Sequence, residues 1–160
     1  FIHSYQFLVI YTTINTKKRY LMNSLTDLFN SEFKNLYALE KECIEIFESV
    51  QEEIEDQDLL QIAKELANDS TKQFELLQEA AKKIDINPGN TTDYVAQEMI
   101  ENLKEISSQQ IPQEVKDDAI LGSFNRMNYY RMACYENTYE LAKKLKYDDL
   151  KSLFFYNIDA

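Results

Sequence analysis

The sequence predicts an all-α fold, an antiparallel four-helix bundle, and two observations predict this class. Along three long segments apolar residues recur at alternating steps of three and four, the spacing that keeps one face of a helix turned toward a core. Turn-forming residues are scarce, because the 160 residues include only two Gly and two Pro. A β-sandwich or β-barrel needs frequent turns, so this scarcity favours a few long helices.

Three long helices are expected, at residues 24–55, 58–84 and 112–146. The first starts at Ser24 and Asp27, an S-x-x-D capping box whose hydroxyl and carboxylate pair with backbone amides at the helix start. The turn between the first two helices is very short, so these helices should be antiparallel neighbours. Pro112 suits the first turn of the third helix.

Two shorter helices complete the expected fold. The breaker Asn87-Pro88-Gly89-Asn90 precedes a short crossover helix at 92–107. A truncated last helix at 148–160 would be about 20 Å long, against about 45 Å for the first. Part of the apolar groove of the bundle would then be uncovered, and a second copy of the chain is the cover we expect. A homodimer is therefore predicted, with residues 1–21 as the alternative cover.

The net charge and the two cysteines limit which binding partners and which cellular compartment we expect. The formal charge of −11 would repel a phosphate backbone, so nucleic-acid binding is not expected. Cys43 and Cys134 both lie on apolar stripes, without CxxC spacing, and should be buried reduced thiols. These features predict a cytoplasmic protein.

Residues 1–21 differ in character from the domain that follows at 22–160. Their apolar run at 7–11 precedes the basic residues at 17–19, the reverse of a signal peptide, and it is too short to cross a membrane. Met22 stands directly before the capping box and is the expected natural first residue. Residues 1–21 are then an N-terminal extension that is not native, or alternatively an arm that packs on the domain or on a neighbour.

Polar residues interrupt the apolar stripes near their middle. The first stripe contains Glu40, the second Asp69 and Gln73, and the third Arg131. Burial of an uncompensated charge costs several kcal/mol. These side chains should therefore contact one another, a metal ion or trapped water.

Motifs on three helices resemble those of a known family. Leu25-Thr26-Asp27-Leu28-Phe29 and Leu36-Tyr37-Ala38-Leu39-Glu40-Lys41 follow the opening pattern of the bacterial YciF-like proteins, a branch of the ferritin-like superfamily. Asp69-Ser70-Thr71-Lys72-Gln73 matches the second helix of that family loosely, and the stretch from Tyr130 to Leu145 matches the third. The resemblance covers residues 24–159. It implies a ferritin-like bundle in which inward carboxylates and histidines hold two iron or manganese ions.

Several positions depart from the family pattern. Glu40 and Asp69 keep carboxylates, whereas Asn128, Tyr129 and Arg131 stand where the resemblance implies Glu, His and Glu. The single histidine, His3, lies far away in the N-terminal extension. Arg131 cannot lose its proton, so it would repel a divalent cation and pair with carboxylates instead. We hypothesise that a degenerate metal site remains, a buried cluster of Glu40, Asp69, Gln73 and Arg131, assisted by Asn128 and Tyr129.

The expected function follows from this hypothesis. The chain is predicted to be a non-catalytic ferritin-like protein, related to stress responses, that acts through assembly or partner binding and needs no cofactor. The alternative is a metal-binding protein with a reduced iron or manganese site on Glu40 and Asp69 that handles iron or peroxide. An acidic adaptor for a basic partner is a third option, but no motif supports it.

Overall fold

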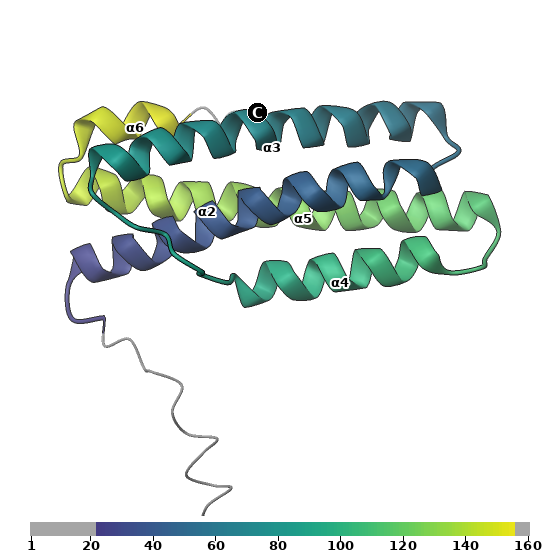
Figure 1. The fold of residues 1–160 in the computed structure, drawn as a ribbon, viewed down its shortest axis with the longest axis horizontal. Coiled ribbons are helices and arrows are strands. Elements are labelled where there is room, and N and C mark those ends of the chain that lie inside the picture. Colours follow the sequence, from purple (N-terminus) through teal and green to yellow (C-terminus); the bar gives the residue numbers. More distant parts are fainter. Residues whose placement is uncertain (1–21, 156–160) are drawn as a thin grey trace, which may run out of the picture.

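A computed structural model describes residues 22–155, which form a bundle of α-helices without strands in that range (Figure 1). The all-α prediction is confirmed. None of the described helices is long and apolar enough to cross a membrane. Predictions for residues 1–21, including His3, and for residues 156–160 lie outside the described part. The helical elements are α2 (Leu25–Ser49), the 3-10 helix η1 (Gln51–Glu53), α3 (Gln57–Lys83), α4 (Tyr94–Ser108), α5 (Gln113–Lys144) and α6 (Asp148–Phe155).

Helix α2 is the centre of the bundle, because it contacts α3, α4 and α5. The chain turns back after α2, so that α3 runs antiparallel to it, and residues 84–93 then cross over the bundle (Figure 1). As a result α4 runs in the same direction as α2, and α5 returns antiparallel to both. The short α6 folds back along α5.

Aromatic side chains fill the core on both sides of the middle of the bundle, toward the start and toward the end of α2. Toward the start of α2, Phe29 lies 5.2 Å from the ring of Tyr147 in an edge-to-face arrangement, and Phe33 lies 6.4 Å from Phe154. Toward the end of α2, Phe47 packs edge to face on Phe124 at 5.3 Å. Such contacts stabilise a core beyond simple burial of apolar area. The stretch of α2 between Phe33 and Phe47 is where polar residues enter the interior.

The starts of the helices are capped by side chains. The hydroxyl of Ser24 accepts a hydrogen bond from the backbone of Asp27 at 3.0 Å and donates one to its carboxylate at 2.8 Å. This is the predicted capping box. Asp56 caps α3 by accepting from the amide of Leu59 at 2.8 Å, and Asp93 caps α4. Capping of this kind satisfies amides that have no partner inside the helix.

Helix α2 ends at Ser49, six residues before the predicted end near residue 55. The chain tightens into η1, and contacts with the start of α5 then hold it extended. The amide of Asp56 donates to Asp117 at 2.9 Å, and the side chain of Gln113 donates to the carbonyl of Glu53 at 2.8 Å. Polar residues far along the chain therefore set this boundary, which local periodicity could not reveal.

Candidate functional site

A buried ion pair joins α2 to α5 in the middle of the bundle. Glu40 is 0% exposed and Arg131 is 5% exposed. The guanidinium of Arg131 donates from Nη2 to both carboxylate oxygens of Glu40 at 3.0 Å, and from Nε to Oε1 at 3.2 Å. Its Nη1 lies 3.5 Å from Oδ1 of Asn128. Both oxygens of Glu40 are therefore engaged by one guanidinium.

The electrostatics of the pair keep the guanidinium charged. Burial lowers the pKa of Arg131, but the adjacent Glu40 carboxylate raises it, and the resulting direction is upward. Burial, and next the Glu40 carboxylate, raise the pKa of the Cys43 thiol. The same two causes raise the pKa of the Tyr135 phenol. The ion pair is therefore surrounded by a neutral thiol and a neutral phenol at ordinary pH.

Helix α3 contributes Ser70 and Gln73 at the level of the ion pair. The rings of Tyr37 and Phe74 are 4.8 Å apart, and because α2 and α3 are antiparallel this contact places Ser70 opposite Glu40. Both α3 side chains point inward, since Ser70 is 0% exposed and Gln73 is 5% exposed. The apolar periodicity indicated Gln73 but not Ser70, although Ser70 lies three residues before Gln73 and therefore on the same helix face.

Two buried hydroxyls beside the ion pair lack a protein partner. The Oγ of Ser70 and the hydroxyl of Tyr135 make no hydrogen bond within the described part of the chain. Buried polar atoms of this kind are normally satisfied by ordered water. The sequence pattern did not indicate Tyr135 as a member of the site. Its spacing of four residues after Arg131 is the signal that could have identified it.

Two residues of the predicted cluster lie at the surface, and the prediction that they join it is wrong. The side chain of Asp69 is 61% exposed and its Oδ1 lies 3.3 Å from Nζ of Lys72. Tyr129 is 72% exposed. Tyr129 precedes Arg131 by two residues, which turns it about 200° away around the helix. Asp69 precedes Ser70, and α3 is rotated so that Ser70 faces the core instead.

The donor set at this site does not fit two metal ions. The oxygens of Glu40 are engaged by Arg131, Gln73 is neutral, and Asp69 lies on the surface. No group of three or more His, Cys, Asp or Glu side chains within residues 22–155 is placed to hold a metal ion. The Glu40 and Asp69 pair required by the alternative hypothesis is therefore not formed.

A second, partly buried polar contact joins the start of α4 to α5. The hydroxyl of Tyr130 lies 2.8 Å from Oδ2 of Asp93, the residue that caps α4. Burial, and next the hydrogen bond to Asp93, raise the pKa of Tyr130. Burial also raises the pKa of the nearby Cys134 thiol to about 11. This contact contains no activated base or nucleophile, so we interpret it as a structural hydrogen bond between α4 and α5.

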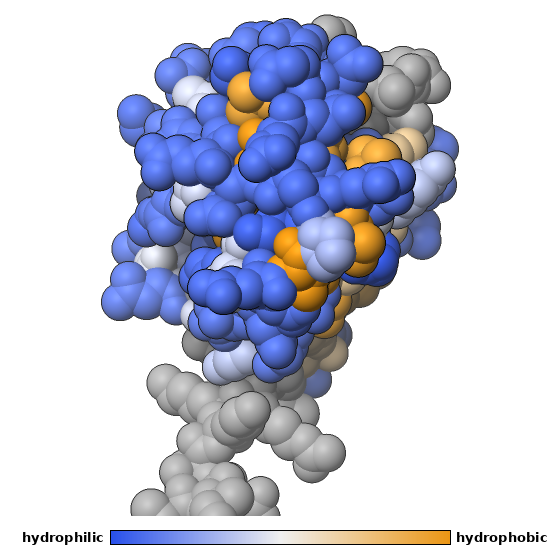
Figure 2. All heavy atoms as spheres, turned by 90° about the vertical axis from the view of Figure 1, so that its right-hand side faces the viewer, coloured by the Kyte–Doolittle hydropathy of each residue, from blue (hydrophilic) through white to orange (hydrophobic). Residues whose placement is uncertain are grey.

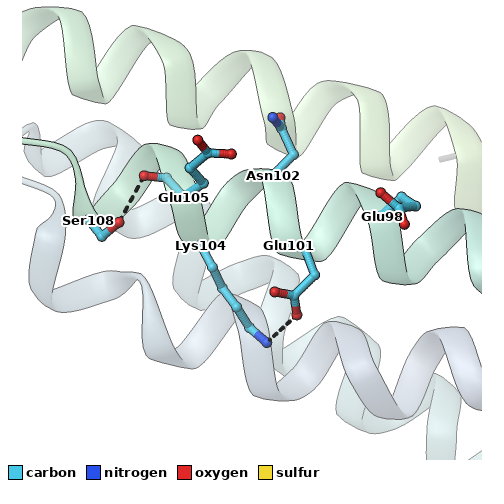
Figure 3. A pocket seen from close by; sticks show the side chains of 6 residues that line it. All are labelled: Glu98, Glu101, Asn102, Lys104, Glu105 and Ser108. Carbon is cyan, nitrogen blue, oxygen red and sulfur yellow. Dashed lines mark hydrogen bonds and ion pairs between the residues drawn. The ribbon is translucent and has the colours of Figure 1, made fainter.

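The outer face of α4 carries carboxylates but no reactive arrangement. A shallow hollow there is lined by Glu98, Glu101 and Glu105 (Figure 3). Glu101 pairs with Lys104 at 3.0 Å, and both side chains are more than half exposed. All the side chains labelled in Figure 3 come from this one helix; Glu101 and Lys104 point toward each other, whereas Glu98, Asn102 and Glu105 do not converge on them. Exposed charged side chains of this kind are typical of a solvated helix face.

Comparison with known proteins gives the family. The model of a family described as a domain of unknown function (DUF892) matches residues 24–159. The chain belongs to this family. No functionally curated protein matches the sequence.

Two solved structures show the same fold as this DUF892 member. The E. coli stress protein YciF superimposes with a TM-score of 0.81 at 18% identity, over 86% of this chain and 87% of YciF. YcfI from Rhodopseudomonas palustris superimposes with a TM-score of 0.82 at 20% identity, over 88% of this chain and 90% of YcfI. The resemblance to YciF-like proteins is thus confirmed, and at this identity the likeness concerns the fold alone.

Proposed function

We propose that this chain is a non-catalytic member of the DUF892 family, of ferritin-like descent, in which the Glu40–Arg131 ion pair takes the place of a dimetal centre. One observation carries the proposal. The guanidinium of Arg131 donates three hydrogen bonds of 3.0–3.2 Å to Glu40, the inward carboxylate that a metal ion would need.

The energetics of the pair oppose exchange for a metal ion. A cation that took the lone pairs of Glu40 would leave the buried guanidinium without its counter-ion, and breaking a buried pair in this way costs about 3–5 kcal/mol. The fixed positive charge would also repel the cation directly. The interior of the bundle then serves to join α2 and α5 in a defined register rather than to perform redox chemistry.

The role in the cell follows by analogy. One structural relative is described as a stress protein, and we propose a stress-related function for this chain through assembly or partner binding. Both cysteines are free and buried. Free thiols favour a reducing compartment, so a cytoplasmic location is part of the proposal.

Elemental analysis of the full chain tests the proposal. Protein expressed with added iron and manganese is expected to contain far less than one metal ion per chain. Arg131→Glu removes the guanidinium and puts a second carboxylate beside Glu40, so this variant should gain thermal stability when Mn²⁺ is added. Arg126→Glu makes the same change in charge on the surface of α5, and it should show no such gain.

A triple variant provides a second test in case Arg131→Glu alone does not fold. Combining Arg131→Glu with Ser70→Glu and Gln73→His supplies the carboxylates and imidazole that iron and manganese prefer, on facing helices. This triple variant should take up metal where the wild type does not. Stoichiometric iron or manganese in the wild-type protein would contradict the proposal and favour the metal-handling alternative.

A further inference from the structure

The hydroxyls of Ser70 on α3 and Tyr135 on α5 are enclosed in the middle of the bundle. Most charged side chains of this chain reach the surface instead, and the end of the bundle where α4 leads into α5 is mainly hydrophilic (Figure 2). Ser70 is 0% exposed and Tyr135 is 1% exposed. Neither hydroxyl has a hydrogen-bond partner within residues 22–155. Both are therefore shut off from bulk water and need a partner inside the protein.

Ser70 differs from other hydroxyl residues on the helices of this chain. Thr71, Ser123 and Thr138 each donate to the carbonyl four residues earlier, at 2.9, 3.0 and 2.8 Å. This local bond is a common way for a serine or threonine within a helix to satisfy its hydroxyl. Ser70 makes no such bond, although it directly precedes Thr71. Its hydroxyl proton is therefore available to a partner outside α3.

The hydroxyl of Tyr135 lies near the carboxylate of Glu40. The ring of Tyr135 packs against Phe154 of α6, with their centroids 6.5 Å apart. Burial, and next the charge of Glu40, raise the pKa of the Tyr135 phenol, which indicates that the phenol and the carboxylate are close. The antiparallel register of α2 and α3 places Ser70 opposite Glu40 as well. The two hydroxyls thus approach one carboxylate from two different helices.

The ion pair determines which kind of ligand fits beside these hydroxyls. A carboxylate offers about four lone-pair positions, two on each oxygen. Arg131 donates to Oε1 of Glu40 from Nε and from Nη2, and to Oε2 from Nη2 alone, so it leaves the second position on Oε2. A cation would be repelled by the guanidinium, and an anion by the carboxylate. A small neutral molecule that both donates and accepts hydrogen bonds fits this environment.

We propose that one ordered water molecule is bound between α2, α3 and α5, where it donates to Oε2 of Glu40 and accepts from the hydroxyls of Ser70 and Tyr135. Three hydrogen bonds are typical of a buried water molecule. A direct bond from one hydroxyl to Oε2 would satisfy only that hydroxyl, whereas the water satisfies both. The inference rests on the ion pair of the proposed function, and it adds a ligand that links α3 to that pair.

Urea unfolding of variants of the full chain tests the shared water. Ser70→Ala and Tyr135→Phe should each raise the equilibrium constant for unfolding about fivefold, because each removes one hydrogen bond to the water. The double variant should raise it by clearly less than the product of the two single effects, since both hydroxyls bind the same molecule. Ser123→Ala is the matched control, because that hydroxyl bonds within its own helix. Its effect should be additive with that of Tyr135→Phe.

Two results of these measurements would overturn the proposal. If Ser70→Ala and Tyr135→Phe stabilise the protein, the hydroxyls have no partner at all, because removing an unsatisfied buried polar group is favourable. If their destabilising effects simply add, the two hydroxyls have separate partners.

A high-resolution crystal structure of the full chain, grown with Mn²⁺, locates the water and distinguishes it from a metal ion. The expected result is a density peak about 3 Å from Oε2 of Glu40 and from both hydroxyls, without anomalous signal. An intact ion pair with no peak beside it would overturn the water site alone. A peak with manganese anomalous signal would overturn the proposed function together with the water site.

Discussion

Arg131 is the residue that sets the balance of buried charge at the centre of the bundle. A guanidinium that is 5% exposed is tolerated only when its charge is balanced, and the carboxylate of Glu40 balances it. Removing one partner leaves a buried charge, whereas replacing both with apolar side chains of similar volume removes the need for balance. These two changes should have very different costs.

Glu40→Gln should lower the free energy of unfolding by about 3–5 kcal/mol, because it leaves Arg131 buried without a counter-charge. The double variant Glu40→Leu with Arg131→Met should be close to the wild type in stability, or above it. Urea unfolding at neutral pH measures both. A decrease in the free energy of unfolding of less than about 1 kcal/mol, which is typical of an exposed ion pair, would contradict the burial of this pair.

The sequence could predict two of the charged residues of the site but misplaced the third. Glu40 and Arg131 lie on stripes of large apolar residues, so their orientation followed from periodicity. On α3 the large apolar residue Ile62 is 39% exposed, whereas the neighbouring Ala63 is 0% exposed, so the large residues do not mark the buried face there. Small residues give a weak sequence signal, yet they occupy the face where helices approach closely. Following the alanines would have placed Ser70 inside and Asp69 outside.

At the scale of elements, α4 makes one stabilising polar contact with α5 and lies near one destabilising carboxylate of α2. Asp93 caps α4 and accepts from Tyr130 of α5. On α2, the Oε2 of Glu42 is buried without a hydrogen-bond partner in the described chain. Desolvation, and next the charge of Asp93, raise the pKa of Glu42 above its ordinary value of 4.5. The ionised carboxylate therefore opposes this interface at neutral pH.

The variant Glu42→Gln should increase stability at pH 7 by about 0.5 kcal/mol, after allowance for solvent screening. A raised pKa in the folded state contributes stability that is fully present below pH 4.5 and is lost as the pH rises through the raised value. The gain from Glu42→Gln should accordingly disappear in acid. Thermal unfolding between pH 4 and 7 measures it against Glu48→Gln, an exposed position on α2. A gain that does not change with pH would contradict this account.

The boundaries of the helices were predictable where local residues set them. The starts of α2 and α3 follow from capping residues next to them in the sequence. The end of α2 does not, because Gln113 and Asp117 hold the following turn from about sixty positions away in the chain. Contacts of this range leave no periodic signal, so the helix predicted from periodicity was longer than α2.

At the scale of the whole molecule, the chain keeps a known fold at low sequence identity. The chain shares its fold with YciF and YcfI at 18% and 20% identity. A fold retained at such low identity depends on the pattern of apolar residues rather than on particular side chains at the centre. We attribute the proposed loss of a dimetal centre to a single guanidinium, that of Arg131.

A crystal of the full chain grown with Mn²⁺, with diffraction recorded at the manganese absorption edge, tests this assignment most directly. Our account predicts density for the Arg131 guanidinium against both oxygens of Glu40 and no anomalous peak between α2, α3 and α5. An anomalous peak bound to Glu40, with Arg131 turned away from it, would contradict the account.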